Sequence, residues 1–473
     1  MSETRPVIWW LRRDLRLSDN PCLQAALATG QPVIPVVILD PLTEAQGAAP
    51  LWRWGLGLGH FTQSLDQIGG RLIFRRGEAL AELQKLIAET GATTVMWSRL
   101  YAPDVNARDA EVKTALKEAD ITAQSHPGHL LFEPWTVKPK SSPFYKVYTP
   151  MWKAVRDIPV AEPSAAPGHW PAPDTWPDSD SLEDWQLGRA MRRGADIVLP
   201  HCRIGEAAAQ ERLDQFIAER IDAYKDERDY PSIAATSRLS ENLTYGEIGI
   251  RSCWHAAMRA KEEGARGAEH FLKELAWREF AYHILHHTPH IAKSNWREGW
   301  DNFGWSTEET PEVTAWKQGR TGVPMVDAAM REMYVTGIMH NRARMIVASY
   351  LTKHLMTHWK IGLAWFEDCL IDWDPASNAL GWQWTAGSGP DAAPYFRIYN
   401  PLTQREKFDA NKTYVDAWIA EEKSDPTETA LTYFQAVPQS WGLSPSDPYP
   451  DEPVVGISEG RKRALEAYEA RDF

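Results

Sequence analysis

Cysteine and long apolar runs are scarce in this chain of 473 residues. The four cysteines, Cys22, Cys202, Cys253 and Cys369, include no CxxC pair, so the sequence supports neither a disulfide framework nor a zinc site. No stretch approaches the ~20 consecutive apolar residues of a membrane-spanning helix, and the first residues lack the apolar core of a secretory signal. We therefore expect a cytoplasmic protein without a membrane partner.

Positive charge is also in deficit, because 51 Lys and Arg face 64 Asp and Glu, a formal net charge of −13. Non-specific affinity for DNA comes from neutralised phosphates, so this balance argues against a protein that coats DNA with basic charge. Residues 331–360 are richer in Lys and Arg than in Asp and Glu. This stretch is a candidate basic patch for docking a duplex.

The familiar nucleotide-binding fingerprints are missing. There is no GxGxxG after a predicted strand and no GxxxxGK[ST]. Gly55, Gly57 and Gly59 form GxGxG without the required flanks, and we interpret them as a flexible turn.

No metal site is expected either. His283, His286, His287 and His290 have helical spacing, but no carboxylate or cysteine completes the set and Pro289 interrupts the helix. The sequence predicts that these histidines bind no metal.

The pattern of apolar residues divides the chain into three regions, as its length suggests. Apolar runs at 7–11, 33–39, 72–74 and 94–97 alternate with helical stretches such as 79–90, which predicts a Rossmann-like α/β domain with a parallel sheet over 1–130. Residues 131–202 are rich in Pro, Ser and Gly and are expected to form an interdomain linker. Residues 203–473 show three-to-four-residue apolar spacing and are expected to be mainly α-helical.

Tryptophan is abundant, with 23 residues in the chain. Most are expected to fill the core, because indole buries a large apolar area. The WxW pair of Trp382 and Trp384 also suggests a redox or base-stacking role.

Several long motifs carry a resemblance to a known family. They are WWLRRDLRLSDNP at 9–21, TSRLS at 236–240, FLKELAWREF at 271–280, TGVPMVDAAMREM at 321–333, MHNRARM at 339–345 and DWDPASNALGWQWTAGSGPDAAPYFRIYNP at 372–401. In these motifs the chain resembles the photolyase/cryptochrome family. The resemblance implies an α/β antenna-binding domain, a long linker and a mainly α FAD-binding domain. It also implies light-driven splitting of cyclobutane pyrimidine dimers in UV-damaged DNA, by electron transfer from photoexcited reduced FAD.

The resemblance also implies an FAD site in the helical region. TSRLS offers hydroxyls, backbone N–H groups and Arg238 just before a helix, as a diphosphate requires. Arg344 and Asp372 are expected to form an ion pair beside the flavin, and Asn378 to face flavin N5, where plant cryptochromes tend to carry Asp and animal ones Cys. The complete implied set is Tyr224, Thr236, Ser237, Arg238, Leu239, Ser240, Arg344, Asp372, Trp373, Asp374 and Asn378.

Electron transfer and substrate binding are implied at further positions. A tryptophan chain that reduces the flavin matches Trp382, Trp359 and Trp305. DNA contacts match Glu274, Trp277, Arg278, Asn341, Arg342, Met345, Trp384 and Gln404, and Glu274 is also implied to act in catalysis. Enzymes that repair (6-4) photoproducts carry histidines where this chain has Asn341 and Met345, so cyclobutane dimers are the expected substrate.

Two other functions remain open. A cryptochrome-type blue-light photoreceptor shares the fold and the flavin but not the repair activity. A light-independent flavin oxidoreductase predicts a nicotinamide-binding fingerprint, which the sequence lacks. A second antenna chromophore is implied, a reduced folate such as methenyltetrahydrofolate in preference to a deazaflavin, and no residues are assigned to it. The protein is expected to be a monomer.

Overall fold

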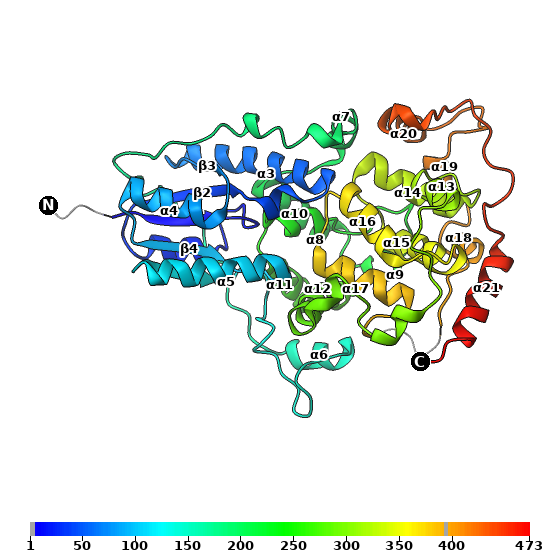
Figure 1. Ribbon diagram of the computed structural model, residues 1–473, viewed down its shortest axis with the longest axis horizontal. Coiled ribbons are helices and arrows are strands. Elements are labelled where there is room, and N and C mark those ends of the chain that lie inside the picture. The colour runs from blue at the N-terminus through cyan, green and yellow to red at the C-terminus, as the bar shows by residue number, and fades with distance from the viewer. Residues whose placement is uncertain (1–4, 392–395) are drawn as a thin grey trace.

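The N-terminal part of the computed structural model, which describes residues 5–391 and 396–473, is built on a parallel sheet (Figure 1). Its strands are β1 Val7–Leu11, β2 Val33–Leu39, β3 Ile73–Arg76, β4 Thr94–Ser98 and β5 Thr122–His126, in the order β3-β2-β1-β4-β5. Both faces of β1 and β2 are buried, which explains why these strands appear in the sequence as unbroken apolar runs. The predicted α/β domain is confirmed.

Helices cover the sheet on both faces. They are α1 Pro21–Leu27, α3 Ala48–Gln67, α4 Ala79–Thr90 and α5 Pro103–Glu118, and the short α2 Pro41–Glu44 follows β2. Successive residues of a strand point to opposite faces. Trp9 accordingly packs in one core cluster with Phe61 of α3, whereas Trp10 packs in another with Leu83 of α4 and Val112 of α5.

The interpretation of Gly55, Gly57 and Gly59 as a flexible turn is wrong, because all three lie within α3. A Cβ atom at position 57 would lie 3.0 Å from Glu247 Oε1 and 3.0 Å from Leu15 Cδ1. The absence of a side chain at Gly57 therefore lets α3 pack closely against Leu15 and Glu247.

The region 131–202 is not structureless. It contains α6 Tyr148–Val155, α7 Gly194–Val198 and the short 3-10 turns Glu183–Trp185, Arg189–Met191 and Leu199–His201. Trp170 is fully buried and donates its indole N–H to the carbonyl oxygen of Val33 at 2.9 Å, so this region folds back onto the sheet.

The remainder of the described chain is helical, with no further strand among its described residues. Its α-helices are α8 Glu206–Glu219, α9 Tyr224–Glu227, α10 Ser240–Tyr245, α11 Ile250–Glu262, α12 Ala268–His287, α13 Pro311–Lys317, α14 Pro324–Thr336, α15 Asn341–Ser349, α16 Trp359–Cys369, α17 Pro375–Ala386, α18 Pro401–Phe408, α19 Thr413–Trp418, α20 Glu428–Ala436 and α21 Ile457–Glu469. Helix α15 continues as a π-helical turn over Tyr350–His354. In the part of the chain that is described, no helix is long and apolar enough to span a bilayer.

Candidate flavin and DNA site

The segment Thr236–Ser240 joins a loop to helix α10, which begins at Ser240 as the sequence predicts. Arg238 has a left-handed backbone with φ of 53°, and its side chain is exposed, as is Ser240. The Ser237 hydroxyl accepts the N–H of Leu239 at 3.4 Å. Three hydroxyls and one guanidinium thus gather at the start of a helix, a donor set that suits a diphosphate.

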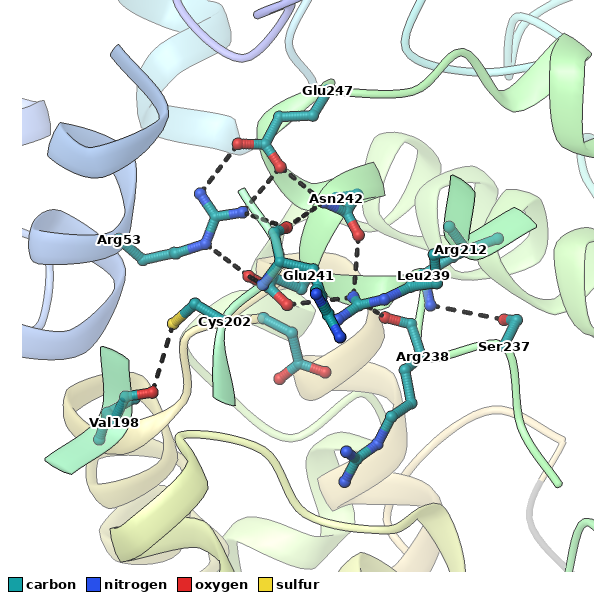
Figure 2. A network of polar contacts seen from close by, with 12 residues as sticks. Arg53, Val198, Cys202, Arg212, Ser237, Arg238, Leu239, Glu241, Asn242 and Glu247 are labelled. Carbon is teal, nitrogen blue, oxygen red and sulfur yellow. Dashed lines mark hydrogen bonds and ion pairs between the residues drawn. The ribbon is translucent and has the colours of Figure 1, made fainter. Parts of the chain in front are cut away.

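A buried polar network lies next to this segment (Figure 2). Arg212 of α8 donates to the carbonyl oxygen of Arg238 at 2.7 Å and to Glu241 at 3.1 Å. Arg53, which comes from α3 of the sheet domain, pairs with Glu241 at 2.6 Å and with Glu247 at 2.7 Å. Sequence reasoning missed these residues because their partners lie far apart along the chain.

Arg344 of α15 pairs with Asp372, as the resemblance implies. Its Nη2 atom lies 2.9 Å from Asp372 Oδ1 and 2.8 Å from Oδ2, and its Nε donates to the carbonyl oxygen of Met339. The carbonyl oxygen of Asp372 accepts the Thr244 hydroxyl of α10 at 3.3 Å. This ion pair is therefore joined to the helix that follows the TSRLS segment.

Asp374 and Asn378 lie at the start of α17. Asp374 caps the helix by accepting the Ser377 N–H at 2.7 Å, and its other carboxylate oxygen accepts the Tyr282 hydroxyl at 2.5 Å. Asn378 lies one turn further along and donates its Nδ2 to the Asp374 carbonyl oxygen at 2.9 Å. Tyr282 was not among the predicted residues, although its position in α12 close to Glu274 and Trp277 is a signal that points to the same site.

The remaining implied flavin residues are buried. Tyr224 packs its ring edge-on against Phe216 and Phe271, and Trp373 and Leu239 belong to the apolar core. Burial raises the pKa of the Tyr224 hydroxyl.

The three predicted redox tryptophans are all buried, with exposed fractions of 3% for Trp382, 0% for Trp359 and 8% for Trp305. The ring of His358 lies 5.4 Å from Trp305 and 5.3 Å from Trp359, between centroids, so it links the outer two. Trp359 donates to Asn295, and Trp305 donates to the carbonyl oxygen of Thr352, each at 2.8 Å.

Trp305 does not form the outer end of this aromatic cluster. Trp300 stacks on it with a centroid separation of 5.5 Å and is itself only 6% exposed. Beyond Trp300, the partly exposed Tyr468 of α21 follows at 6.3 Å. Trp316 also lies close to Trp382, at 6.3 Å between ring centroids. The spacing of these residues in the sequence gave no sign of either contact.

The residues expected from α12 have separate partners. Trp277 is half-buried and stacks on Tyr148 of α6, with 3.8 Å between ring centroids and 6° between planes. Glu274 forms an ion pair with Arg228. The Arg278 guanidinium instead donates to the carbonyl oxygen of His129 at 2.8 Å, and its side chain is 12% exposed.

Helix α15 presents Asn341 at its exposed first turn, with Arg342 and Met345 partly buried. Arg342 pairs with Asp229 at 2.5 Å, and its guanidinium lies 4.4 Å above the Phe408 ring. His340 caps the helix by accepting the Arg342 N–H on Nδ1, and burial lowers the pKa of His340 to about 4.

Two expected DNA contacts lie on other helices. Trp384 of α17 donates its indole N–H to the Asp391 carbonyl oxygen at 3.0 Å, and Gln404 of α18 is half-buried.

The expectation of a basic patch over 331–360 is wrong for two of its cationic residues. Arg331 is fully buried and pairs with Glu421 at 2.7 Å, and Lys353 is fully buried as well. Arg342 and Arg344 are committed to ion pairs with Asp229 and Asp372. A count of charges within residues 331–360 could not predict this, because the acidic partners lie outside that stretch.

Comparison with known proteins matches two parts of the chain to family models. Residues 7–168 match the family model described as DNA photolyase, and residues 271–470 match that described as the FAD binding domain of DNA photolyase. The deoxyribodipyrimidine photo-lyase of Agrobacterium fabrum is 42% identical over 99% of this chain and 98% of its own length.

Solved structures agree with this match. The crystal structure of a bacterial class III photolyase from Agrobacterium tumefaciens aligns with a TM-score of 0.90 and 41% identity, over 99% of this chain and 98% of that one. The Synechocystis cryptochrome aligns with a TM-score of 0.85 and 26% identity, over 99% of this chain and 100% of that one. The matched models and the near-complete overlap with a close relative show that this chain belongs to the DNA photolyase family.

Proposed function

We propose that the protein is a deoxyribodipyrimidine photo-lyase, which uses light to split cyclobutane pyrimidine dimers in UV-damaged DNA. The observation that carries this proposal is the amide of Asn378, held by Asp374 at the start of α17 in a chain of this family. Relatives that are named for this activity cover nearly the whole chain.

FAD fits the residues that the fold gathers. The FAD diphosphate needs hydrogen-bond donors, which are offered by the exposed Arg238 and by the hydroxyls of Thr236, Ser237 and Ser240. The Arg344–Asp372 pair is connected to the helix that begins at Ser240, because the Thr244 hydroxyl donates to the Asp372 carbonyl oxygen. When bound, the flavin supplies a light-excited electron donor.

The hydrogen bond of Asn378 favours a reduced flavin. One hydrogen of its Nδ2 is donated to the Asp374 carbonyl oxygen, and its Oδ1 is an acceptor that the cofactor can use. An amide oxygen accepts a hydrogen bond from an N–H group, which N5 carries in the reduced flavin. The neutral amide also adds no charge beside the ring.

The DNA-side residues suit a flipped dimer. Extruding a base pair costs a few kcal/mol, least for damaged bases, so deformability contributes to selectivity. Trp277 and Trp384 offer aromatic surface, and Glu274 offers a carboxylate that accepts hydrogen bonds from the thymine edges. Asn341, Arg342 and Met345 are proposed to contact the flipped dimer and its backbone, and Gln404 is proposed to contact the DNA.

The type of lesion that is repaired depends on whether the site offers a group that can donate a proton. A cyclobutane dimer opens after one electron arrives and needs no general acid, whereas a (6-4) product also requires proton transfer. Asn341 and Met345 do not supply a proton. His340 is committed to capping α15, so it does not replace them.

A second chromophore, a reduced folate in preference to a deazaflavin, is proposed to act as an antenna. In open α/β sheets a ligand commonly binds where the strand order reverses, here between β1 and β4. Arg12, which follows β1, pairs with Asp109 of α5 at 2.9 Å, and Arg108 of α5 pairs with Asp40, which follows β2. An absorption spectrum of the purified protein distinguishes the two chromophores.

The proposed enzyme acts as a monomer in the cytoplasm. The scattered cysteines, which are all free in the structure, fit a reducing compartment. Sedimentation of the purified protein tests its oligomeric state.

The alternative function is a cryptochrome-type blue-light photoreceptor, which the likeness to the Synechocystis cryptochrome favours. The deciding experiment illuminates the reduced protein with oligonucleotides that carry either lesion and quantifies restored thymines. We expect thymines from the cyclobutane oligonucleotide only. Repair of the (6-4) oligonucleotide alone would overturn the choice of lesion, and repair of neither would favour the photoreceptor.

A further inference from the structure

We infer that the sheet domain takes part in holding FAD, because Arg53 and Arg212 act through Glu241 as positioning residues for the segment Thr236–Ser240. This inference rests on the proposed binding of the FAD diphosphate by that segment. It implies that the N-terminal domain must dock on the helical domain before the segment Thr236–Ser240 takes the conformation that binds FAD.

The charged residues of this network are buried and paired with one another. The side chains of Arg53, Glu241 and Glu247 are each 0% exposed, and that of Arg212 is 13% exposed. A buried charge is tolerated only when it is fully paired. The positive charges of two guanidinium groups neutralise the negative charges of two carboxylates. Removing one of these groups would therefore leave a buried charge without a partner.

The backbone of Arg238 is held in an unfavourable conformation. Its left-handed φ of 53° is unfavourable for a residue with a Cβ, and such a conformation persists only where its surroundings fix it. Arg212 supplies that constraint by donating to the Arg238 carbonyl oxygen at 2.7 Å. The same nitrogen donates to Asn242 at 2.9 Å, so it ties the segment to the first turn of α10.

The network also joins the sheet domain to the helical domain. Arg53 lies within α3, and its Nη2 atom also donates to the carbonyl oxygen of Arg203 at 3.2 Å, just before α8. One turn later in α3, a Cβ at Gly57 would come within 3.0 Å of Glu247 Oε1 and 3.4 Å of Arg53 Nη1. The glycine thus leaves room for the Arg53–Glu247 pair. Figure 2 shows Arg53 reaching Glu241 and Glu247 from the α3 side, opposite Arg212.

These contacts form one path. Arg53 holds Glu241, Glu241 holds Arg212, and Arg212 holds the backbone of Arg238. Domain docking and FAD binding are therefore coupled, and a change on either side alters the affinity on the other.

The test measures the dissociation constant for FAD of the full-length apoprotein by quenching of flavin fluorescence, together with the melting temperature of the apoprotein. Arg212→Ala is expected to raise the dissociation constant at least tenfold, and Arg212→Lys to recover part of the loss. The matched control is Arg220→Ala, an exposed arginine at the end of α8, which should leave FAD affinity unchanged. Riboflavin lacks the diphosphate, so its affinity should not change in Arg212→Ala.

A variant in the other domain tests the coupling. Gly57→Ala retains every charged side chain of the network but crowds the Arg53–Glu247 pair. It should weaken FAD binding several-fold, although position 57 is not a predicted flavin residue. Wild-type FAD affinity in Arg212→Ala or in Gly57→Ala would overturn the inference, as would an equal loss of riboflavin affinity. A wild-type protein that binds no FAD would overturn the proposed function as well, so the two failures are distinguishable.

Discussion

The Tyr282 hydroxyl donates a hydrogen bond to the Asp374 carboxylate across 2.5 Å, between two side chains that are 3% and 7% exposed. A hydrogen bond to a charged group contributes about 1.5–3 kcal/mol to stability, and loss of the donor leaves a buried oxygen without a partner. Tyr282→Phe should therefore lower the free energy of unfolding by about that amount, measured by urea denaturation. The exposed Tyr230 offers a matched control, since Tyr230→Phe should change stability by less than about 0.5 kcal/mol. Equal effects of the two substitutions would contradict this role.

Replacing Trp382 with Phe should greatly slow reduction of the flavin under blue light while FAD stays bound. Because Trp300 stacks on the buried Trp305, we also expect Trp300→Phe to slow it. The absorbance of oxidised flavin, followed during illumination with a reductant, measures both rates. Trp185→Phe, in the core of the sheet domain, serves as the control and should reduce at the wild-type rate. Wild-type photoreduction in Trp382→Phe would show that the proximal donor is another residue.

The ion pair between Arg342 and Asp229 predicts opposite effects of two substitutions on DNA binding. Arg342→Ala should weaken binding to damaged and undamaged duplex and reduce the salt slope by about one charge. Asp229→Asn frees the guanidinium for phosphate and should strengthen binding to both. Filter binding at several salt concentrations measures these changes. Unchanged affinity in both variants would remove Arg342 from the DNA-binding surface.

Stability should depend on pH through Glu279. Burial raises the pKa of this carboxyl from 4.5 to about 7, although it accepts the N–H groups of Leu131 and Phe132. A carboxyl whose pKa is higher in the folded state binds more protons there than in the unfolded state, so stability falls as the pH rises between these two values.

The difference corresponds to about 3 kcal/mol between pH ~4.5 and pH ~7. Glu279→Gln keeps an acceptor for both N–H groups and should flatten this part of the profile, measured by urea denaturation at each pH. The exposed Glu262 provides the control substitution, Glu262→Gln, which should keep the wild-type slope. A slope that persists in Glu279→Gln would assign the pH dependence to another group.

The sequence predicted the fold where local patterns are strong. Strands β1 to β4 were found because they are apolar runs, whereas β5 was missed because Thr122–His126 is a polar edge strand with alternating exposure. The pairing of Arg344 with Asp372 followed from the family resemblance. The Arg53–Glu241 contact could not be predicted, since it joins two domains and neither residue stands in a recognisable motif. Arg331 appeared to be surface charge because its partner Glu421, which neutralises it in the core, lies 90 residues further along the chain.

The stacking of Tyr148 on Trp277 limits how a base of the proposed DNA substrate can reach the indole. Tyr148 covers one face of the indole, so a base can approach only the opposite face. Tyr148 belongs to the region that joins the two domains, and its hydroxyl is anchored on the Lys273 carbonyl oxygen at 2.7 Å. If Trp277 stacks on DNA as proposed, the connecting region therefore decides which face of the indole receives the base.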